Sequence, residues 1–328
     1  MFDIIGELMK NASTMAVRIV FMGTPRFAVA TLEALLHNGY RVVAVCTQPD
    51  KAAGRGRPIV SSPVKRLALE RQIPIIQLET FESSKIVAEL ASLRPELIIV
   101  TAFGCVLPPQ VLSLPKLGCL NVHPSLLPRH RGPSPVATAI LHGDEVTGVT
   151  IMLMDTGLDT GPIIAREEVG ITCADTTESL SAKLADVGAK LLLRTLPGWL
   201  GGDLKPQAQD QCQATYSKLI TGGDAEIDWG LSALELWRMV RAYTPWPGCY
   251  TWCRGKRLKI HGAVPLPDGK DGEIGKVIAL TEQPGIGVVT KEGILGLRQI
   301  QLEGKRQMAA TDFVRGKRDF IGCILGRK

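Results

Sequence analysis

Apolar, β-branched runs alternate with amphipathic stretches through the first part of the chain. Val17 to Met22 is an apolar run that ends at Gly23, and Arg41 to Thr47 is a second run of the same kind. Between these runs, Thr24 and Pro25 open a predicted helix. Because a strand, a helix and a parallel strand in this order form a right-handed crossover, we expect an α/β fold with a doubly wound, mostly parallel sheet.

The same alternation predicts further elements up to residue 200, after which the character of the sequence changes. Residues 205–216 are polar and show no periodicity, which is typical of a linker. Short strands separated by Gly and Pro turns then favour a smaller antiparallel β-barrel domain. We expect one domain over residues 16–204, a linker over 205–216 and a second domain over 217–328. The remaining predicted strands are 97–101, 118–123, 146–154, 161–169, 250–253, 258–261, 275–280, 287–290 and 295–301, and the remaining predicted helices are 63–71, 81–93, 135–141, 177–200 and 232–243.

One short segment places two polar side chains at the end of a predicted strand. An apolar run reaches Asn121 and His123 before the chain breaks at Pro124. Residues two apart in a strand point to the same face, so the amide and the imidazole are expected to project together. The ends of strands in an open α/β sheet are also where such sheets bind their ligands.

The net charge of +6 is unevenly distributed along the 328 residues. From Ser217 onward there are 18 Lys or Arg against 12 Asp or Glu, and the rest of the chain has 20 of each. This basic excess is expected of a domain that approaches a polyanion, although a solvated surface without a partner explains it equally well. No apolar run approaches the roughly 20 residues of a membrane span, and residues 1–16 do not resemble a signal or transit peptide. We therefore expect no membrane association.

Composition and motifs argue against a metal or a dinucleotide cofactor. The eight cysteines are scattered through mostly apolar segments, and Cys249, Cys253 and His261 are too few for a metal site. Such cysteines are simplest to explain in a reducing cytoplasm. The turn after the first predicted strand has a single glycine, Gly23, and Pro25 offers no N–H to a pyrophosphate. We therefore do not expect NAD or a flavin.

Residues 48–62 are expected to form a long, irregular loop that contains Lys51, Arg55 and Arg57 among glycines. Loops of this length are uncommon unless they are functional or disordered, and arginine matches the geometry of phosphate. The loop is therefore a candidate contact for a phosphate-bearing ligand. A merely solvated loop is the alternative.

Asp159 completes a set of three reactive candidates with Asn121 and His123. Asn121 can donate hydrogen bonds to an oxyanion, His123 titrates near neutral pH, and Asp159 follows a predicted strand where it could orient the imidazole. No Ser or Cys occupies a recognisable nucleophile setting, so the set suits acyl transfer to an amine of the substrate. Taken singly, His123 is also explained as a packing residue and Asp159 as the cap of a turn.

Residues 121–128, Asn-Val-His-Pro-Ser-Leu-Leu-Pro, followed by Arg131 and Gly132, resemble the signature of the folate-dependent formyltransferases. Residues 154–161 resemble it as well, and the similarity runs from about Val17 to the C-terminus. The resemblance implies a transferase that takes a formyl group from 10-formyltetrahydrofolate. Within this family, the sequence is similar to the members that formylate methionyl initiator tRNA for translation initiation.

The resemblance also implies roles for individual residues. Asn121 and a protonated His123 are expected to stabilise the oxyanion, with Asp159 holding His123. The family's second domain is a barrel related to the OB-fold that binds tRNA, which agrees with the basic C-terminal part of this chain. The implied folate-binding residues are Ser125, Leu126, Leu127, Pro128, Phe103, Gly104, Val106 and Leu107, and the implied tRNA-binding residues are Lys51, Arg55 and Arg57.

Two alternatives stay open on the sequence alone. The acceptor could be a glycinamide nucleotide or an amino-sugar nucleotide, although the basic second domain and the arginine loop favour tRNA. The chain could instead be an inactive RNA-binding or folate-sensing module, against which the intact set of Asn121, His123 and Asp159 argues. We expect a cytoplasmic, bacterial-type monomer without a metal.

Overall fold

A computed structural model describes residues 17–52, 59–267 and 272–326 of the chain. The chain divides into two compact units. Unit 1 contains residues 1–135, 146–170 and 181–217, and unit 2 contains residues 136–145, 171–180 and 218–328. The chain therefore passes from one unit to the other five times, after residues 135, 145, 170, 180 and 217.

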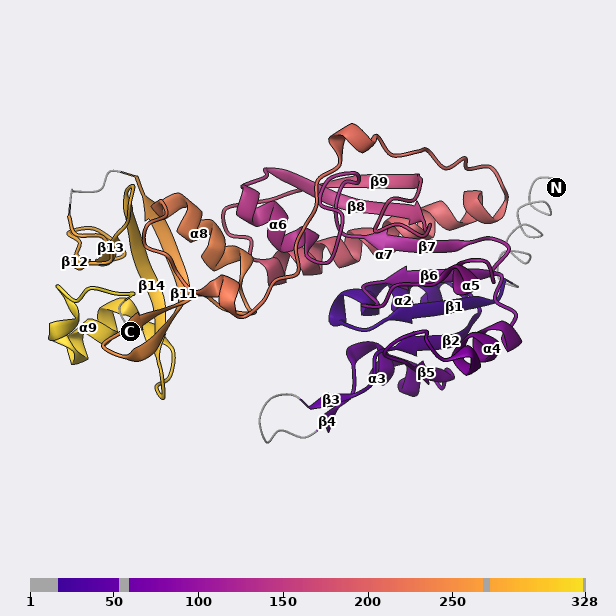
Figure 1. Ribbon diagram of the computed structural model, residues 1–328, viewed down its shortest axis with the longest axis horizontal. Coiled ribbons are helices and arrows are strands. Elements are labelled where there is room, and N and C mark those ends of the chain that lie inside the picture. The colour runs from indigo at the N-terminus through magenta and orange to yellow at the C-terminus, as the bar shows by residue number, and fades with distance from the viewer. Residues whose placement is uncertain (1–16, 53–58, 268–271, 327–328) are drawn as a thin grey trace. The chain divides into compact units, whose positions relative to one another are not determined.

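Unit 1 is built on a sheet that has seven strands in the described part of the chain (Figure 1). In sheet order these strands are β5 (Ile75–Gln77), β2 (Val42–Thr47), β1 (Ile19–Gly23), β6 (Leu97–Thr101), β7 (Cys119–His123), β8 (Val146–Leu153) and β9 (Ile163–Gly170). Neighbours from β5 to β7 pair in parallel, whereas the β7–β8 and β8–β9 pairs are antiparallel. The predicted mostly parallel α/β sheet is confirmed.

Apolar side chains from both faces of this sheet form the core of unit 1. One cluster joins Met22 of β1 and Val100 of β6 to Leu90 of a helix and to Cys119 at the start of β7. On the opposite face, an added Cβ on Gly188 would come within 2.9 Å of Val122, so a helix packs closely against β7 there. Because strand residues alternate, Asn121 and His123 lie on the same face as Cys119. The helices of this unit are α2 (Arg26–His37), α3 (Pro63–Glu70), α4 (Ser84–Ser92), α5 (Pro109–Leu112) and most of α7 (Thr177–Leu200).

Two segments of unit 1 differ from the sequence-based description. The segment over residues 48–62, expected to be irregular, contains two short strands, β3 (Lys51–Ala52) and β4 (Ile59–Val60), that pair antiparallel. Residues 205–216, expected to be a linker, belong to unit 1 and contain a short 3-10 helix, η1 (Gln211–Gln213). Within this segment, the backbone of Gln207 exchanges two hydrogen bonds of 2.7 and 2.8 Å with Ile163 at the start of β9.

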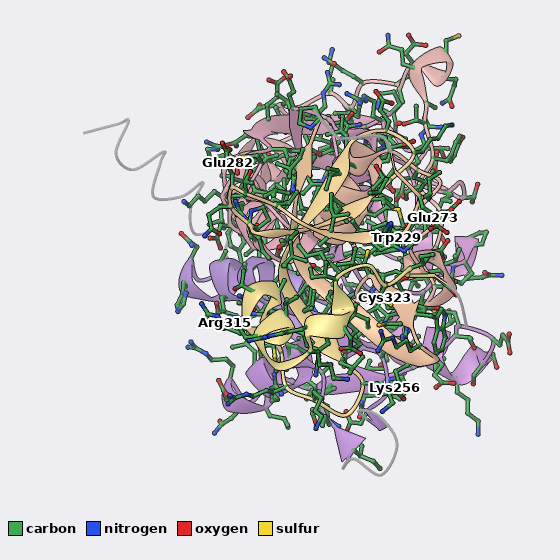
Figure 2. The ribbon with its side chains drawn as sticks, turned by 90° about the vertical axis from the view of Figure 1, so that its left-hand side faces the viewer. Trp229, Lys256, Glu273, Glu282, Arg315 and Cys323 are labelled. Carbon is green, nitrogen blue, oxygen red and sulfur yellow. The ribbon has the colours of Figure 1, made fainter. Side chains whose placement is uncertain are left out.

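Unit 2 contains an antiparallel half-barrel sheet, which confirms the predicted β-domain. Helix α8 (Ala233–Ala242) begins with a capping box in which Ser232 and Glu235 satisfy each other's backbone N–H groups. Trp229, which is labelled in Figure 2, is buried and donates its indole N–H to Thr251 Oγ1 at 3.0 Å. In sheet order the strands are β10 (Tyr250–Cys253), β11 (Lys256–Leu266), β14 (Ile294–Leu302), β13 (Ile286–Val289) and β12 (Val277–Ala279), with β15 (Met308–Ala309) paired to β14; the helices are α6 (Pro135–His142), α8 (Ala233–Ala242), α9 (Ala310–Gly316), η2 (Gly223–Ala225) and η3 (Arg318–Phe320).

Across the described residues of both units, no helix combines the length and the apolar character that crossing a bilayer requires.

Candidate active site

The end of strand β7 presents Asn121 and His123 on one face of the sheet of unit 1. Strand β7 pairs with β6 on one side and with β8 on the other, where Asn121 lies opposite Met152 and His123 opposite Thr150. Pairing on both sides fixes the backbone of β7, and both side chains are largely buried, with 9% of Asn121 and 4% of His123 exposed. The polar groups are therefore held in place before any ligand arrives.

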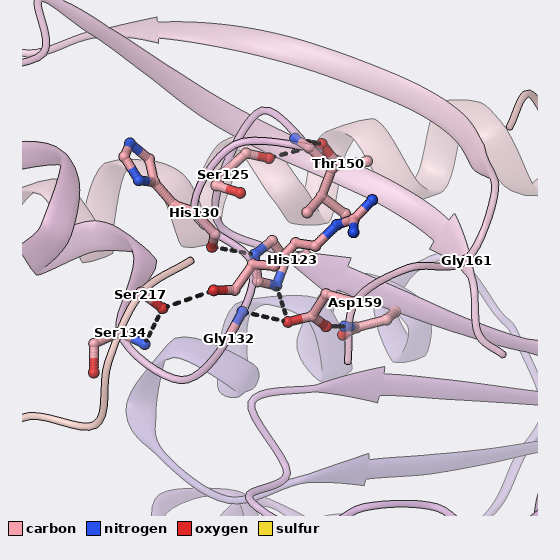
Figure 3. Close-up of polar contacts among 12 residues, drawn as sticks. His123, Ser125, His130, Gly132, Ser134, Thr150, Asp159, Gly161 and Ser217 are labelled. Carbon is pink, nitrogen blue, oxygen red and sulfur yellow. Dashed lines mark hydrogen bonds and ion pairs between the residues drawn. The ribbon is translucent and has the colours of Figure 1, made fainter. Parts of the chain in front are cut away.

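The loop between β8 and β9 brings Asp159 to His123 (Figure 3) and to Asn121. Its Oδ2 lies 3.7 Å from His123 Nδ1, and its Oδ1 accepts a hydrogen bond of 3.4 Å from Asn121 Nδ2. The backbone N–H of Gly132 donates to the same carboxylate at 2.8 Å. Asp159 has a backbone φ of +53°, in the left-handed region that residues other than glycine adopt only uncommonly. The three residues that the sequence singles out thus lie together.

The imidazole of His123 lies between a carbonyl and a carboxylate. Its Nε2 is 3.2 Å from the carbonyl oxygen of His130, which can only accept, so Nε2 carries a hydrogen and Nδ1 of the neutral ring faces Asp159. Burial lowers the pKa of His123 below its usual value of 6.5, and the charge of Asp159 opposes this shift. The resting imidazole is therefore neutral, and the imidazolium expected from the sequence would have to form during the reaction.

The segment after β7 is held by its own hydrogen bonds. Ser125 is fully buried, and its hydroxyl donates to the carbonyl of Arg129 at 2.6 Å. Thr150 Oγ1 donates to the carbonyl of Ser125 at 2.7 Å and accepts from the N–H of Leu127 at 3.1 Å. Leu127 and Pro128 are buried, whereas Leu126 is half-buried beside a cavity of about 440 Å³. The buried hydroxyl of Ser125 therefore stabilises the backbone conformation of this segment.

The loop after β6 divides into fixed and exposed parts. Phe103 and Leu107 are buried in the core of unit 1, and Thr24 donates a hydrogen bond of 3.1 Å to the carbonyl of Phe103. Between them, Gly104 is exposed with a φ of +82°, and Val106 is 79% exposed beside a cavity of about 410 Å³. The fixed ends hold an exposed stretch of backbone and apolar surface that a flat ligand could contact.

Two family matches cover nearly all of the described chain. Residues 17–196 match the Formyl transferase family, and residues 219–318 match the Formyl transferase, C-terminal domain family. The chain belongs to the formyl transferase family.

Relatives of this formyl transferase match it almost from end to end. It is 47% identical over 314 residues to the methionyl-tRNA formyltransferase of Roseiflexus sp., covering 95% of this chain and 96% of the relative. It is 43% identical over 316 residues to the methionyl-tRNA formyltransferase of Pseudomonas fluorescens, covering 96% of this chain and 98% of that one. The folds agree as well. The structure of an N-formyltransferase from Helicobacter canadensis, solved with folinic acid and dTDP-3-aminofucose, matches with a TM-score of 0.62 at 20% identity over 89% of this chain and all of that one.

The arginine loop of the formyl transferase is described only at its base. Strand β3 includes the backbone of Lys51, whereas Arg55 and Arg57 lie outside the described residues. Lys65 Nζ donates to Asp50 Oδ2 at 2.6 Å, which lowers the pKa of Asp50. This contact fixes the point at which the loop leaves the sheet.

Several residues that contact the site were not selected from the sequence. Gly132 donates its backbone N–H to Asp159. Gly132 lies in the segment that resembles the family signature, so the sequence did contain a signal for it. The side chain of Gln209 reaches the Asp159 loop from residues 205–216, where the absence of periodicity gave no signal. Within residues 17–52, 59–267 and 272–326, no group of three or more His, Cys, Asp or Glu side chains could hold a metal ion.

Proposed function

We propose that this formyl transferase moves the formyl group of 10-formyltetrahydrofolate to the α-amino group of methionyl initiator tRNA. The relatives from Roseiflexus and Pseudomonas fluorescens carry the name of this activity and match over nearly the whole chain. The observation that carries the chemistry is the convergence of Asn121, His123 and Asp159, with contacts of 3.4 and 3.7 Å at the end of β7.

The acceptor amine attacks the formyl carbon directly in the proposed reaction. A free α-amino group has a pKa of roughly 7.7–8.0, so a sizeable neutral fraction is present near neutral pH. A bond forms between the amine nitrogen and the formyl carbon, and the bond from that carbon to N10 of the folate breaks. The amine loses one proton and N10 gains one, so the step balances without an oxidant or a reductant.

Asn121 is the proposed donor to the formyl oxygen. Its Nδ2 carries two hydrogens, one of which is directed to Asp159 Oδ1 at 3.4 Å. The second is free to bind the oxygen on which negative charge develops during attack. Because the amide is uncharged and already oriented, it stabilises the transition state with little reorganisation.

His123 is the proposed carrier of the proton. In the neutral ring Nδ1 has a lone pair, which accepts the amine proton as the carbon–nitrogen bond forms. The resulting imidazolium is stabilised by Asp159 Oδ2, 3.7 Å away. Burial disfavours the charged ring, which favours release of the proton to the leaving nitrogen.

The proposed folate-binding residues combine apolar support with accessible backbone. Buried Phe103 and Leu107 hold the exposed stretch around Gly104 and Val106, which suits a flat ring that needs both apolar contact and backbone hydrogen bonds. The hydroxyl of Ser125 acts indirectly in this proposal, because it already donates to Arg129. The full set is Phe103, Gly104, Val106, Leu107, Ser125, Leu126, Leu127 and Pro128.

The acceptor tRNA is proposed to bind through positive charge on both parts of the chain. Lys51, Arg55 and Arg57 are the proposed contacts of the arginine loop, and the basic excess beyond Ser217 is the proposed surface of the second domain. In this proposal residues 16–204 carry the formyl-folate chemistry and residues 217–328 bind tRNA. Such an enzyme acts as a monomer in the cytoplasm, where its aminoacyl-tRNA acceptor is made.

A formylation assay with three acceptors tests the proposed function. The wild-type protein is supplied with 10-formyltetrahydrofolate and with methionyl initiator tRNA, a glycinamide nucleotide or an amino-sugar nucleotide. Of the three acceptors, we expect only methionyl initiator tRNA to be formylated. Arg55→Ala is expected to raise KM for this tRNA while folate binding is unchanged. Preferential formylation of a small amine would contradict tRNA as the proposed acceptor. No turnover with any of the three acceptors would contradict the proposal that the chain is a formyltransferase.

A further inference from the structure

We propose that Gln209 is a positioning residue for formyl transfer, which holds the Asp159 loop in the conformation that the reaction needs. The proposal rests on the function proposed above and adds a residue from a segment that the sequence presents as a linker. Gln209 contacts neither His123 nor Asn121 in the described structure, so it acts through the backbone of the loop.

The side-chain amide of Gln209 joins the loop to a buried arginine. Its Nε2 donates to the carbonyl oxygens of Asp159 at 2.9 Å and of Gly161 at 2.7 Å. Its Oε1 accepts from Arg131 Nε at 3.1 Å and from Arg131 Nη2 at 2.7 Å. Gln209 is 7% exposed and Arg131 is completely buried, so water does not compete for these contacts.

The chemistry of the two neighbours selects an amide at position 209. The guanidinium of Arg131 only donates hydrogen bonds, and the two loop carbonyls only accept them. A side chain between them must therefore accept at one atom and donate twice at another, which an amide does and a carboxylate, an alcohol or a hydrocarbon does not. The same argument fixes the orientation of the amide.

The Asp159 loop needs such support because its backbone is unusual. Asp159 has a φ of +53°, which a non-glycine residue keeps only where its surroundings impose it. At Gly161 an added Cβ would lie 1.8 Å from the carbonyl oxygen of Leu153, so the chain passes close to the end of β8 there. Gln209 holds the carbonyls on both sides of Thr160 and thereby fixes the turn that aims the Asp159 carboxylate.

Arg131 links this support to the other side of the same carboxylate. The residue after it, Gly132, donates its N–H to Asp159 Oδ2 at 2.8 Å. Arg131 Nη1 also donates to Gln211 Oε1 at 2.8 Å and to the hydroxyl of Tyr216 at 3.3 Å. Arg131 thus supports Asp159 in two ways. It holds Gln209, which fixes the backbone of the loop, and it precedes Gly132, which binds the carboxylate.

Gln209→Glu tests the proposal, with Gln211→Glu as its matched control. Both variants place a carboxylate on the guanidinium of Arg131, but at position 209 it is buried against two carbonyls, whereas position 211 is exposed. Melting curves of both variants are therefore recorded first, and kinetics are compared at a temperature at which both are folded. Only at position 209 does the new oxygen replace a donor that faces two carbonyls. We expect Gln209→Glu to lower kcat by about 10- to 100-fold, because small misplacements of a reacting group are costly, while KM changes by less than about threefold. Gln211→Glu is expected to keep the wild-type kcat.

Kinetics are compared on the high-pH plateau, so that the effect of the added charge on the titration of His123 does not enter. The amides of Asp159, Thr160 and Gly161 are followed by NMR in the same variants, and we expect large shifts in Gln209→Glu alone. This readout needs no acceptor, so a failure of the proposed acceptor leaves it intact. Wild-type kcat in Gln209→Glu, or loop signals that match those of Gln211→Glu, would overturn the positioning role.

Discussion

The polar side chains that carry the two proposed tasks lie in different settings in the two units. In unit 1, Asn121, His123 and Arg131 are buried, and each has a defined partner within the unit. In unit 2, by contrast, many basic side chains are exposed, among them Lys256, Lys291, Arg298 and Lys305. Stabilising a transition state requires groups fixed to fractions of an ångström, whereas attracting a polyanion requires only charge at the surface. Substitutions in the two units should therefore fail in different ways.

The largest effect is expected from Asn121→Ala in unit 1. Losing a preorganised donor to an oxyanion typically costs about 10²–10³ in kcat, and folate binding and folding should be little changed. Steady-state kinetics with saturating tRNA, together with a melting curve, measure both. Asn38→Ala, which removes an amide from the exposed C-cap of α2, serves as the control. Turnover of Asn121→Ala within a few-fold of the wild type would remove Asn121 from the mechanism.

A pH dependence should follow from the buried imidazole. Protonation of the acceptor amine, whose pKa is roughly 7.7–8.0, should already lower activity below that pH. Since burial lowers the pKa of His123, protonation of its ring should make the fall with decreasing pH steeper by about a further factor of ten per pH unit below that lowered pKa. The unfolded chain binds this proton at about pH 6.5, so below that pH it holds more protons than the folded protein, and stability declines with falling pH. His123→Gln should lose this part of the decline. Urea unfolding at several pH values gives the free energy of unfolding of the two proteins. The same dependence of this free energy on pH in both would contradict the lowered pKa of His123.

Charge removal in unit 2 should act on binding and on salt dependence. We expect the triple variant Lys256→Ala, Arg298→Ala and Lys305→Ala to raise KM for tRNA about tenfold with kcat unchanged. The slope of log affinity against log salt should fall by up to about 1 for each lost phosphate contact. Arg315→Ala is the control, because Arg315 is already paired with Asp312 at 2.9 Å. An unchanged slope would mean that this surface does not contact the tRNA.

The smallest effect on activity is expected at the start of α8. Ser232→Ala removes the capping box and should lower the free energy of unfolding by about 0.5–2 kcal/mol. Because Ser232 belongs to unit 2, the contacts of Asn121 and His123 should be unaffected. Chemical denaturation measures the loss, and kcat at 25 °C serves as the internal control. A large fall in kcat would show that the two units depend on each other more closely than the comparison assumes.

The sequence predicted what depends on periodic burial and missed what depends on polar contacts between distant segments. The runs that became β1, β6 and β7 are buried throughout, so their apolar pattern was clear. The same alternation placed Asn121 and His123 on one face. That Asp159 could orient His123 was inferred from its place after a predicted strand, and the resemblance assigned it the same role, but the contact of 3.7 Å across 36 residues came from the structure. Gln209 gave no signal, since one polar side chain in a polar segment has no period, and the roles of Arg55 and Arg57 stay predictions.

The division of the chain between the units affects how such proteins can be recombined. Unit 2 is not a single C-terminal stretch, because it also takes residues 136–145 and 171–180 from within the first part of the chain. A cut at residue 204 would leave residues 205–217, including Gln209, on the wrong fragment. Exchanging the second domain between relatives would therefore require a crossover after residue 217 together with both internal segments. In this chain each of the two units is assembled from three segments, so the boundary between the units in space differs from the single boundary that the sequence indicates.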